Sequence, residues 1–499
     1  MNDGISTAAD YHWATAHIRN KIKPHFLDFD HYPAPFKAYD AIKKIDFLKD
    51  IYPAEKDLMV LFSGNNTEKQ YTEPDFRGLS KVLFLSYGVT RREKAREIPF
   101  FSRTVPSAGG LYPCHVYLIV RQMKDLETGV YYCDMIQESL ILIQRGTFSH
   151  DQGSACDISF VITGIFFNSA WKYRERAFRY LLLDSGHLIE NLSLAAKAEG
   201  FFSRLDYDFD DDKISALLSL DNEKEVPLAC IHSGEQEPGK RFEDMLNLSG
   251  PCSKEIKKEW QEVSYPILKY IHELGKADFE NGSIDPESMK VMTSETEEPI
   301  NISNYEIYND FLDYEKAVFL RRSKRNFIPE ILDREKVTTL MNAASSLNKR
   351  IDNHSAVAGT FLILGVSFQK VEGFKDGFYI FSEDGTSLFL IRNGRFHGSL
   401  SRVCLDQQWV SHAAMNFLFM ANLTGLEKTL GPRGYRLVLM ESGRIAQRIY
   451  LAATGLGLGC CGVGALYDEE AQALFGLTPD SALFYVVSAG QVKGKQKQI

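Results

Sequence analysis

What this sequence lacks excludes several classes of protein. Its 499 residues carry a net charge of −9 and no long basic run, which argues against a nucleic-acid partner. The eight cysteines form no CxxC pair and no cysteine–histidine spacing typical of zinc, so neither a metal site nor a disulfide framework is indicated. No apolar run approaches the roughly 20 residues that span a bilayer, so no membrane segment is expected.

The N-terminal region also lacks familiar signals. Residues 1–10 have neither the basic nor the apolar part of a signal peptide. We therefore expect a soluble, cytoplasmic protein with reduced thiols. Residues 1–60 are polar and aromatic and contain several histidines, but the histidine spacing fits no common metal-ligand pattern, so no metal is expected.

The length points to more than one domain. A chain of 499 residues is too long for one compact core, and 44% hydrophobic with 25% charged residues is ordinary for a globular protein. The sequence also repeats itself, because residues 176–200 align with residues 433–457 without a gap. The matched features are Gly186 with Gly443, Gly200 with Gly457, helix starts near 211 and 468, and strands over 228–232 and 484–487. Spaced leucines alone could match by chance, but matched glycines and downstream elements indicate a tandem duplication.

Apolar periodicity predicts the other elements of the first copy. The expected helices are 75–87 and 174–200, and the expected strands are 116–120, 129–133, 139–144, 158–166 and 227–231. Between the copies, residues 233–313 are polar and broken by turns, with an acidic piece at 293–298. Two short helices are expected there, near 255–263 and 267–274.

The stretch from Ser102 to Val120 contains a distinctive bend, PSAGGLYP, at residues 106–113. Gly109 and Gly110 permit backbone angles closed to other residues and let a flat ligand approach the main chain. A proline at each end stiffens the bend and removes an N–H group from any strand ladder. An ordinary turn before a strand and a ligand-binding bend are both compatible with these residues.

The second copy opens with a basic segment, LRRSKRNF, at residues 320–327. Guanidinium groups keep their charge and offer paired donors, so with a hydroxyl group they suit a phosphate dianion. A solvated basic start of a helix is the alternative. The residues concerned are Arg321, Arg322, Ser323 and Arg325.

A glycine-rich segment at residues 456–464 follows the long helix of the second copy. Its backbone can bring N–H groups to the edge of a planar ring, although an ordinary helix-to-strand turn is the alternative. No recognisable neighbour lowers the thiol pKa of Cys460 or Cys461, so we interpret both as buried small residues. Lys493 and Lys495 follow in an irregular tail.

Lys172 and Tyr173 form a further candidate pair, in the segment WKYRERAFRY. A lysine beside a tyrosine near an apolar cleft can act as base and proton relay, provided that burial lowers the lysine pKa. A surface lysine beside a core tyrosine is the alternative. The second copy has Thr429 and Leu430 at these positions, so any such function belongs to the first copy alone.

Together these segments resemble a known family. PSAGGLYP and WKYRERAFRY are similar to segments of the SagB-type dehydrogenases, a branch of the nitroreductase-like flavoproteins that includes thiazoline and oxazoline oxidases. LRRSKRNF resembles the RRSxRxF opening of nitroreductases, whereas Phe178 departs from the tyrosine usual in the branch. The resemblance covers nearly the whole chain. It implies an α+β fold in which each copy has a central, mostly antiparallel sheet flanked by helices.

The resemblance also implies a cofactor, FMN, and roles for individual residues. In azoline dehydrogenases a Lys–Tyr pair removes the ring proton as hydride passes to the flavin, and this pair corresponds to Lys172 and Tyr173. In nitroreductases the basic segment holds the phosphate and ribityl chain, and glycine-rich backbone addresses the flavin ring. The expected cofactor-binding residues are Arg321, Arg322, Ser323, Arg325, Pro106, Ser107, Ala108, Gly109, Gly110, Leu111, Cys461, Gly462, Val463, Gly464 and Lys493.

Four parts of the chain are expected on this basis. Residues 1–60 form a strap over the first domain, 61–235 the first nitroreductase-like domain, 236–313 a linker with surface helices, and 314–499 the second domain.

The two copies carry different equipment. Nitroreductase dimers build each flavin site from both subunits, with the bend from one and the Arg-Ser-Arg cluster from the other. Residues 346–360 of the second copy lack the bend, and residues 62–69 of the first lack the arginines. We therefore expect an intramolecular pseudo-dimer, its helices 174–200 and 433–457 facing each other, with one complete site and one FMN per chain.

Three functions follow from this resemblance. The first is an FMN-dependent dehydrogenase that oxidises an azoline or similar C–N unit in a peptide or peptide-derived metabolite. The second is a nicotinamide-dependent reductase of nitro or quinone compounds, and the third is a non-catalytic relic that binds flavin or a partner. No GxGxxG motif follows a predicted strand, so a nicotinamide cofactor would visit the flavin only transiently. The sequence shows no adenine-binding fold, which favours FMN over FAD. Biosynthetic partner proteins and the oligomeric state are left open.

Overall fold

A computed structural model gives the structure of most of the chain. It describes residues 4–22, 25–49, 56–63, 75–95, 98–148, 157–201, 203–233, 242–244, 246–250, 252–256, 262–276, 289–292, 298–303, 305–306, 308, 312–347 and 360–494. The chain divides into two compact units. The first-copy unit comprises residues 26–54 and 64–276, and the second-copy unit comprises residues 1–25, 55–63 and 277–499.

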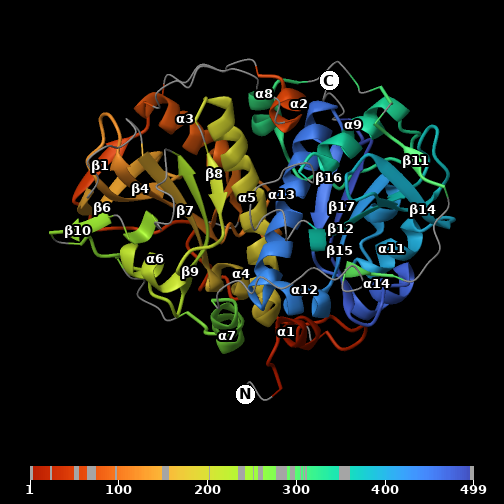
Figure 1. Cartoon of the computed structure of the whole chain (residues 1–499), viewed down its shortest axis with the longest axis horizontal. Coiled ribbons are helices and arrows are strands. Elements are labelled where there is room, and N and C mark those ends of the chain that lie inside the picture. The colour runs from red at the N-terminus through yellow and green to blue at the C-terminus, as the bar shows by residue number, and fades with distance from the viewer. Residues whose placement is uncertain are drawn as a thin grey trace. The chain divides into compact units, whose positions relative to one another are not determined.

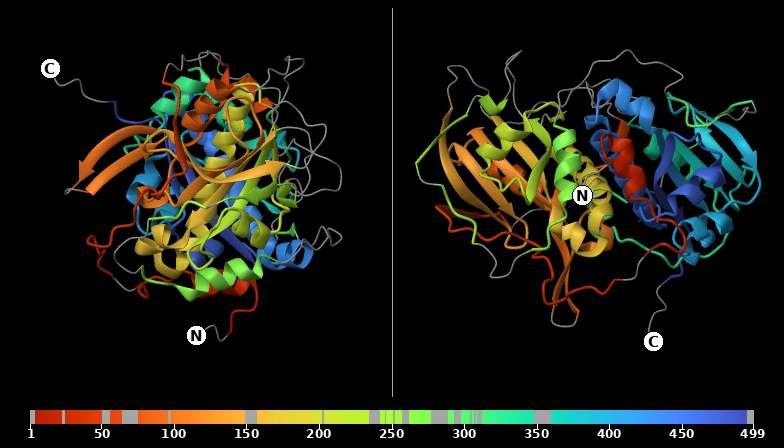
Figure 2. Two further views of the ribbon diagram at one scale, coloured as in Figure 1. Left: turned by 90° about the vertical axis from the view of Figure 1, so that its left-hand side faces the viewer. Right: turned by 90° about the horizontal axis from the view of Figure 1, so that it is seen from below.

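The first-copy unit is built on one antiparallel sheet of eight strands (Figure 1). Its strand order is β1-β6-β5-β4-β7-β9-β8, and β10 pairs with β6. The strands are β1 (Lys43–Asp46), β4 (Cys114–Gln122), β5 (Gly129–Asp134), β6 (Ser139–Phe148), β7 (Asp157–Ile165), β8 (Arg204–Asp206), β9 (Glu225–Ser233) and β10 (Leu246–Ser249). Two further strands, β2 (Val89–Ala95) and β3 (Ile98–Arg103), form a separate hairpin that stands away from this sheet (Figure 2).

The second-copy unit contains a seven-stranded antiparallel sheet with the order β11-β14-β13-β12-β15-β17-β16. Its strands are β11 (Ile300–Asn301), β12 (Ile363–Phe368), β13 (Gly377–Phe381), β14 (Ser387–Asn393), β15 (Met415–Asn422), β16 (Gly459–Val463) and β17 (Ser481–Gly490). When the seven strands along each path are renumbered in chain order, the two sheets have the same strand order. The α+β fold class and the duplication are therefore both confirmed.

The helices of the first-copy unit are α3 (Phe76–Tyr87), α4 (Phe166–Tyr173), α5 (Ala177–Ala198), α6 (Asp211–Leu217) and α7 (Pro266–Leu274). Four of them correspond to predicted helices, whereas α4, which lies between the predicted strand 158–166 and the predicted helix 174–200, was not predicted. The Asp75 side chain accepts a hydrogen bond from the Gly78 N–H at 2.7 Å, which fixes the start of α3. Helix α5 packs on β4, β7 and β9, and Gly200, with φ of 77°, ends it in a left-handed turn.

The helices of the second-copy unit are α1 (Ala8–Ala14), α2 (Leu58–Ser63), α8 (Tyr314–Leu320), α9 (Arg334–Ser345), α11 (His397–Val403), α12 (Leu423–Leu430), α13 (Arg433–Gly455) and α14 (Asp468–Phe475). The long helix α13 packs against α8, α9 and α12 and against the strands β16 and β17. It is the counterpart of α5, as the aligned repeat predicts.

Each sheet buries an apolar core of its own. Strand β4 is buried at every position but its last, as expected for a central strand, and its Tyr117 and Ile119 share one face. These two side chains join a cluster that reaches Ile214 of α6. In the second-copy unit, Phe378 of β13 packs with Phe475 of α14 in the equivalent position beneath its sheet.

Two expectations about the segments outside the repeats are wrong. Residues 1–60, here called the leader, were expected to form a strap over the first domain, but residues 4–22 belong to the second-copy unit. There the Glu427 carboxylate accepts the Ala8 N–H at 3.1 Å, a long-range contact that no local pattern encodes. The helix expected near 255–263 is not seen at its start, where Glu255 pairs with Tyr39 in a β-bridge.

Several predicted segments cannot be compared with the structure. Residues 257–261, 293–297, 64–69, 348–359 and Lys495 lie outside the described residues. Within the described part of the chain, no helix is both long and apolar enough to cross a membrane. Nor do the described residues bring together three potential metal ligands.

Candidate functional site

The PSAGGLYP bend is a 3₁₀ turn, Ala108–Gly110, between β3 and β4. Gly109 has φ of 65° and Gly110 has φ of 69°, both in the left-handed region. Residues with a side chain adopt this region at a cost of about 1–2 kcal/mol. The glycines are therefore required by the backbone, as the sequence predicts.

Lys172 and Tyr173, at the end of α4, lie directly over this bend. A Cβ atom built on Gly109 would lie 3.0 Å from the Tyr173 hydroxyl oxygen, 3.2 Å from Lys172 Cδ and 3.3 Å from Lys172 Nζ. The absence of a side chain at Gly109 thus lets the amine and the phenol approach the main chain. The structure brings together the two segments of the first copy that were singled out for chemistry.

Aromatic packing holds the end of α4 in place. The Tyr173 ring lies 4.3 Å, centroid to centroid, from the Tyr180 ring. The Trp171 indole N–H donates to the Asp28 carbonyl at 2.7 Å, and the Tyr32 ring meets the Trp171 ring edge-on. Part of the leader therefore does cover the first copy, at the helix that carries Lys172.

Asp184 of α5 is a residue that the sequence analysis missed. Its carboxylate accepts a hydrogen bond from the Ser107 hydroxyl at 2.6 Å and from the Ala108 N–H at 3.0 Å. Burial raises the pKa of Asp184 to about 7, although both hydrogen bonds oppose the shift. The sequence feature that could have identified it is an acidic residue on the buried face of a long predicted helix.

The buried Asp184 carboxyl predicts a pH-dependent stability. The pKa of Asp184 is about 7 in the folded protein, and its ordinary value is 3.8. At a pH between these two values the carboxyl is therefore more often protonated in the folded state than in the unfolded state. The free energy of unfolding therefore falls as pH rises from about 4 to about 7. Over this pH range the free energy of unfolding of the parent should fall, relative to that of an Asp184→Asn variant, by on the order of 4 kcal/mol, since one pKa unit corresponds to about 1.4 kcal/mol. Urea unfolding of both proteins across this range measures it, and a constant difference between them would contradict the assignment.

Gly109 offers a second test of the local geometry. Gly109→Ala places a side chain in the left-handed region and against Tyr173, so we expect a loss of about 1–2 kcal/mol in the free energy of unfolding. Urea unfolding measures the loss. Gly398→Ala is the matched control, because Gly398 lies in helix α11 with no heavy atom within 4 Å of an added Cβ. An equal effect of both substitutions would show that the bend tolerates a side chain.

In the second-copy unit, the basic segment pairs with the glycine-rich segment. Ser323 and Cys460 form a parallel β-bridge, and the Lys324 N–H donates to the Cys460 carbonyl at 2.9 Å. The Gly462 N–H donates to the Tyr450 hydroxyl at 2.7 Å, and that hydroxyl lies 3.2 Å from Ser323 Oγ. Two segments far apart in the sequence thus meet around one tyrosine of α13.

Tyr450 is the second residue that the sequence analysis missed. The Arg321 guanidinium lies 5.9 Å from the centre of its ring, and burial raises the pKa of Tyr450 well above its usual value. In the ungapped repeat, Tyr450 aligns with Ser193, so only the copy with the basic segment has a tyrosine here. This difference between the copies was the signal that could have found it.

The remaining basic residues lie along the same segment. The Arg325 guanidinium lies 5.7 Å from the ring centre of Trp409, and the Lys493 N–H donates to the Asn326 carbonyl at 3.0 Å. Arg322 donates instead to main-chain carbonyls, including that of Arg321 at 2.6 Å. The irregular tail therefore runs beside the basic segment, as the loose sequence match suggests.

The glycine-rich segment is strand β16, with Val463 as its last residue and Gly464 directly after it. A Cβ atom on Gly462 would lie 1.9 Å from the Tyr485 hydroxyl, so no larger residue fits. Burial raises the pKa values of the Cys460 and Cys461 thiols, which keeps both protonated and agrees with their interpretation as buried small residues. The glycines form no dinucleotide fingerprint, since they follow a helix and not a strand.

The donor set of the second copy suits the phosphate of FMN. Arg321 is buried and carries a charge that burial does not remove, while Ser323 and Arg325 are exposed at the same segment. Paired guanidinium donors and a hydroxyl match a dianion with several acceptor oxygens.

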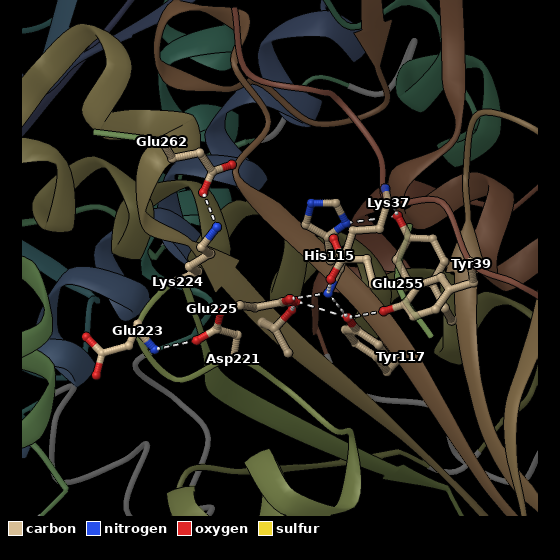
Figure 3. A network of polar contacts seen from close by, with 12 residues as sticks. Lys37, Tyr39, His115, Tyr117, Asp221, Glu223, Lys224, Glu225, Glu255 and Glu262 are labelled. Atoms are coloured by element: carbon tan, nitrogen blue, oxygen red, sulfur yellow. Dashed lines mark hydrogen bonds and ion pairs between the residues drawn. The ribbon is translucent and has the colours of Figure 1, made fainter. Parts of the chain in front are cut away.

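A second polar network in the first-copy unit has a different character (Figure 3). The buried Glu225 carboxylate accepts from Lys37 Nζ at 2.6 Å and from the Tyr117 hydroxyl at 3.1 Å. Burial alone would raise the pKa of Glu225, but Lys37 and its other donors bring it below the usual value. Both groups stay charged near neutral pH, so we interpret the network as an anchor that ties the leader to the sheet.

Comparison with known proteins adds a family to this geometry. The sequence model of the nitroreductase family matches residues 89–235 and 371–491, one segment in each copy. A protein of Methanocaldococcus jannaschii that carries a nitroreductase name is 30% identical over 159 residues, which are 31% of this chain and 80% of that protein. The trifolitoxin-processing protein TfxB of Rhizobium leguminosarum bv. trifolii is 26% identical over 133 residues, 24% of this chain and 36% of that protein.

A solved structure extends the likeness to the whole chain. A protein of Anabaena variabilis, also described as a nitroreductase, superposes with a TM-score of 0.73 at 24% identity. The match covers 98% of this chain and 100% of that one. At this identity the match establishes the fold.

Proposed function

Because this chain belongs to the nitroreductase family and is an oxidoreductase, we propose that it is an FMN-dependent dehydrogenase of the SagB type. Its substrate would be an azoline or similar C–N unit in a peptide or peptide-derived metabolite. The observation that carries this proposal is the position of Lys172 Nζ and the Tyr173 hydroxyl over Gly109. Oxidation of a C–N unit removes a proton from carbon and therefore needs a base, whereas reduction of a nitro group or a quinone takes up protons, which solvent can supply.

The proposed cofactor residues fall into two groups. Arg321, Ser323 and Arg325 would hold the FMN phosphate and ribityl chain, while the PSAGGLYP bend and strand β16 would lie at the ring. When bound, FMN supplies an acceptor for a hydride. One FMN per chain stays a proposal, as does the pairing of the copies as a pseudo-dimer. Release of FMN on denaturation, at a stoichiometry near one and not near two, is the result that supports both the cofactor and the single site.

The residues of the first copy would handle the proton. Oxidation of an azoline to an azole removes one proton and one hydride from the ring. Lys172 or Tyr173 takes the proton from the ring carbon, and the other residue passes it toward solvent. Oxygen or another acceptor then receives the electron pair, so that atoms and electrons balance over the cycle.

The similarity to a protein named for the processing of trifolitoxin supports a biosynthetic substrate. It also supports, as part of the proposal, the presence of biosynthetic partner proteins. The nitroreductase name of the M. jannaschii relative favours the second candidate, an NAD(P)H-dependent reductase of nitro or quinone compounds.

One assay separates these functions. FMN-loaded protein is incubated in air with a small aryl thiazoline carboxamide, here called the thiazoline probe, and separately with NADPH and menadione. The dehydrogenase oxidises the thiazoline probe to the thiazole, seen by mass spectrometry as the loss of two hydrogen atoms. Turnover of menadione alone would favour the reductase, and no turnover of either would favour the non-catalytic reading.

A further inference from the structure

Asp184 reaches the PSAGGLYP bend from a different element, the long helix α5. Only 7% of its surface is exposed, and its carboxylate accepts the Ala108 N–H at 3.0 Å and the Ser107 hydroxyl at 2.6 Å. The bend is thus held at its first half by a side chain that lies outside the motif.

The contact extends to the second half of the bend through Ser107. The same hydroxyl that donates to Asp184 accepts the Tyr112 N–H at 2.9 Å. One carboxylate therefore fixes, directly and through one hydroxyl, the N–H groups on both sides of Gly109. Gly109 is the residue over which the Lys172 amine and the Tyr173 hydroxyl lie.

The second copy has an acidic residue at the same helix position, although its sequence lacks PSAGGLYP. The aligned residue there is Glu441, which is also buried. Its carboxylate pairs with Arg444, one turn along its own helix, at 2.8 Å and 3.0 Å. The acidic residue occurs in both copies: in the first copy it binds the bend, and among the described residues of the second copy it pairs within its own helix.

We propose that Asp184 is a positioning residue for the reaction, which holds the bend so that Gly109 passes beneath Lys172 and Tyr173. This inference rests on the proposed function for its catalytic consequence. The structural part of the inference, that Asp184 keeps the bend ordered, is independent of the proposed function. The two parts are tested by separate measurements.

Hydrogen–deuterium exchange tests the structural part. In the full-length protein, Asp184→Ala removes the acceptor, so exchange in a peptide covering residues 106–113 should become about tenfold faster or more. Asp184→Asn keeps an oxygen for the Ala108 N–H and an amide for Ser107, so it should restore exchange to near the parent rate. Glu441→Ala is the matched control, because its carboxylate pairs within α13, and it should leave exchange in the bend unchanged.

Turnover of the thiazoline probe tests the catalytic part. Asp184→Ala should lower kcat about tenfold or more with KM nearly unchanged, and Asp184→Asn should recover most of it. Parent-like exchange in Asp184→Ala, or equal loss in both Asp184 variants, overturns the inference. If the parent itself does not oxidise the thiazoline probe, the proposed function fails, and exchange alone then decides whether Asp184 holds the bend.

Discussion

Lys172→Ala and Tyr173→Phe each lower the rate of thiazoline probe oxidation by about 10² to 10⁴, the usual effect of removing a positioned base. The Lys172 amine and the Tyr173 hydroxyl both lie over Gly109, so either loss leaves the ring proton without an acceptor or without a path to solvent. FMN content should stay that of the parent, because neither residue belongs to the proposed phosphate-binding group. Steady-state oxidation of the thiazoline probe and the flavin absorbance measure the two quantities.

A matched variant guards against a general effect of removing a lysine. Lys213 is exposed on helix α6 of the same unit, and Lys213→Ala should oxidise the thiazoline probe at the parent rate. Reduction of the flavin by dithionite should be the same in all variants, since it needs no base. Parent-like oxidation by both Lys172→Ala and Tyr173→Phe would show that the pair is structural.

Arg321→Ala and Arg325→Ala should each weaken FMN binding by about 10- to 100-fold, as expected when a charge-assisted hydrogen bond to a phosphate is lost. Arg321 is buried beside Tyr450, and Arg325 lies over the Trp409 ring, so both guanidinium groups are held by the fold. Titration of the apoprotein with FMN, followed by the quenching of flavin fluorescence, gives the dissociation constant without any assay of activity.

Lys324→Ala is the control for this pair. It removes the same charge from the same segment, but Lys324 is not among the proposed phosphate ligands, so a screened surface charge should change the FMN dissociation constant by only about threefold or less. Equal losses in all three variants would mean that the segment attracts FMN by its net charge. Unchanged binding in Arg321→Ala would remove this segment from the cofactor site.

Much of the fold could be predicted because it is encoded locally or by repetition. Asp75 caps α3 where the apolar stripe begins, and β4 is the buried strand that the β-branched residues at 116–120 indicate. The ungapped match of 176–200 with 433–457 predicts two equivalent long helices, and both are present. The order of the strands within each sheet could not be predicted from these local patterns. The structure shows that both copies share one strand order.

The parts that were missed depend on contacts between distant segments. Asp184 and Tyr450 both appear in the sequence as members of a buried helix stripe, and nothing local indicates that one holds the bend and the other joins two segments. The leader was assigned to the first copy by the family resemblance, whereas contacts such as that of Ala8 with Glu427 place its first part in the second-copy unit.

The central claim is that this chain removes a hydride and a proton from an azoline ring with FMN as acceptor. Anaerobic mixing of the FMN-loaded protein with the thiazoline probe, without any nicotinamide, tests it in a single turnover. The account predicts that the yellow flavin is bleached and that one thiazole is formed for each flavin reduced. A flavin that stays yellow with the thiazoline probe, and is bleached by NADPH instead, would contradict it.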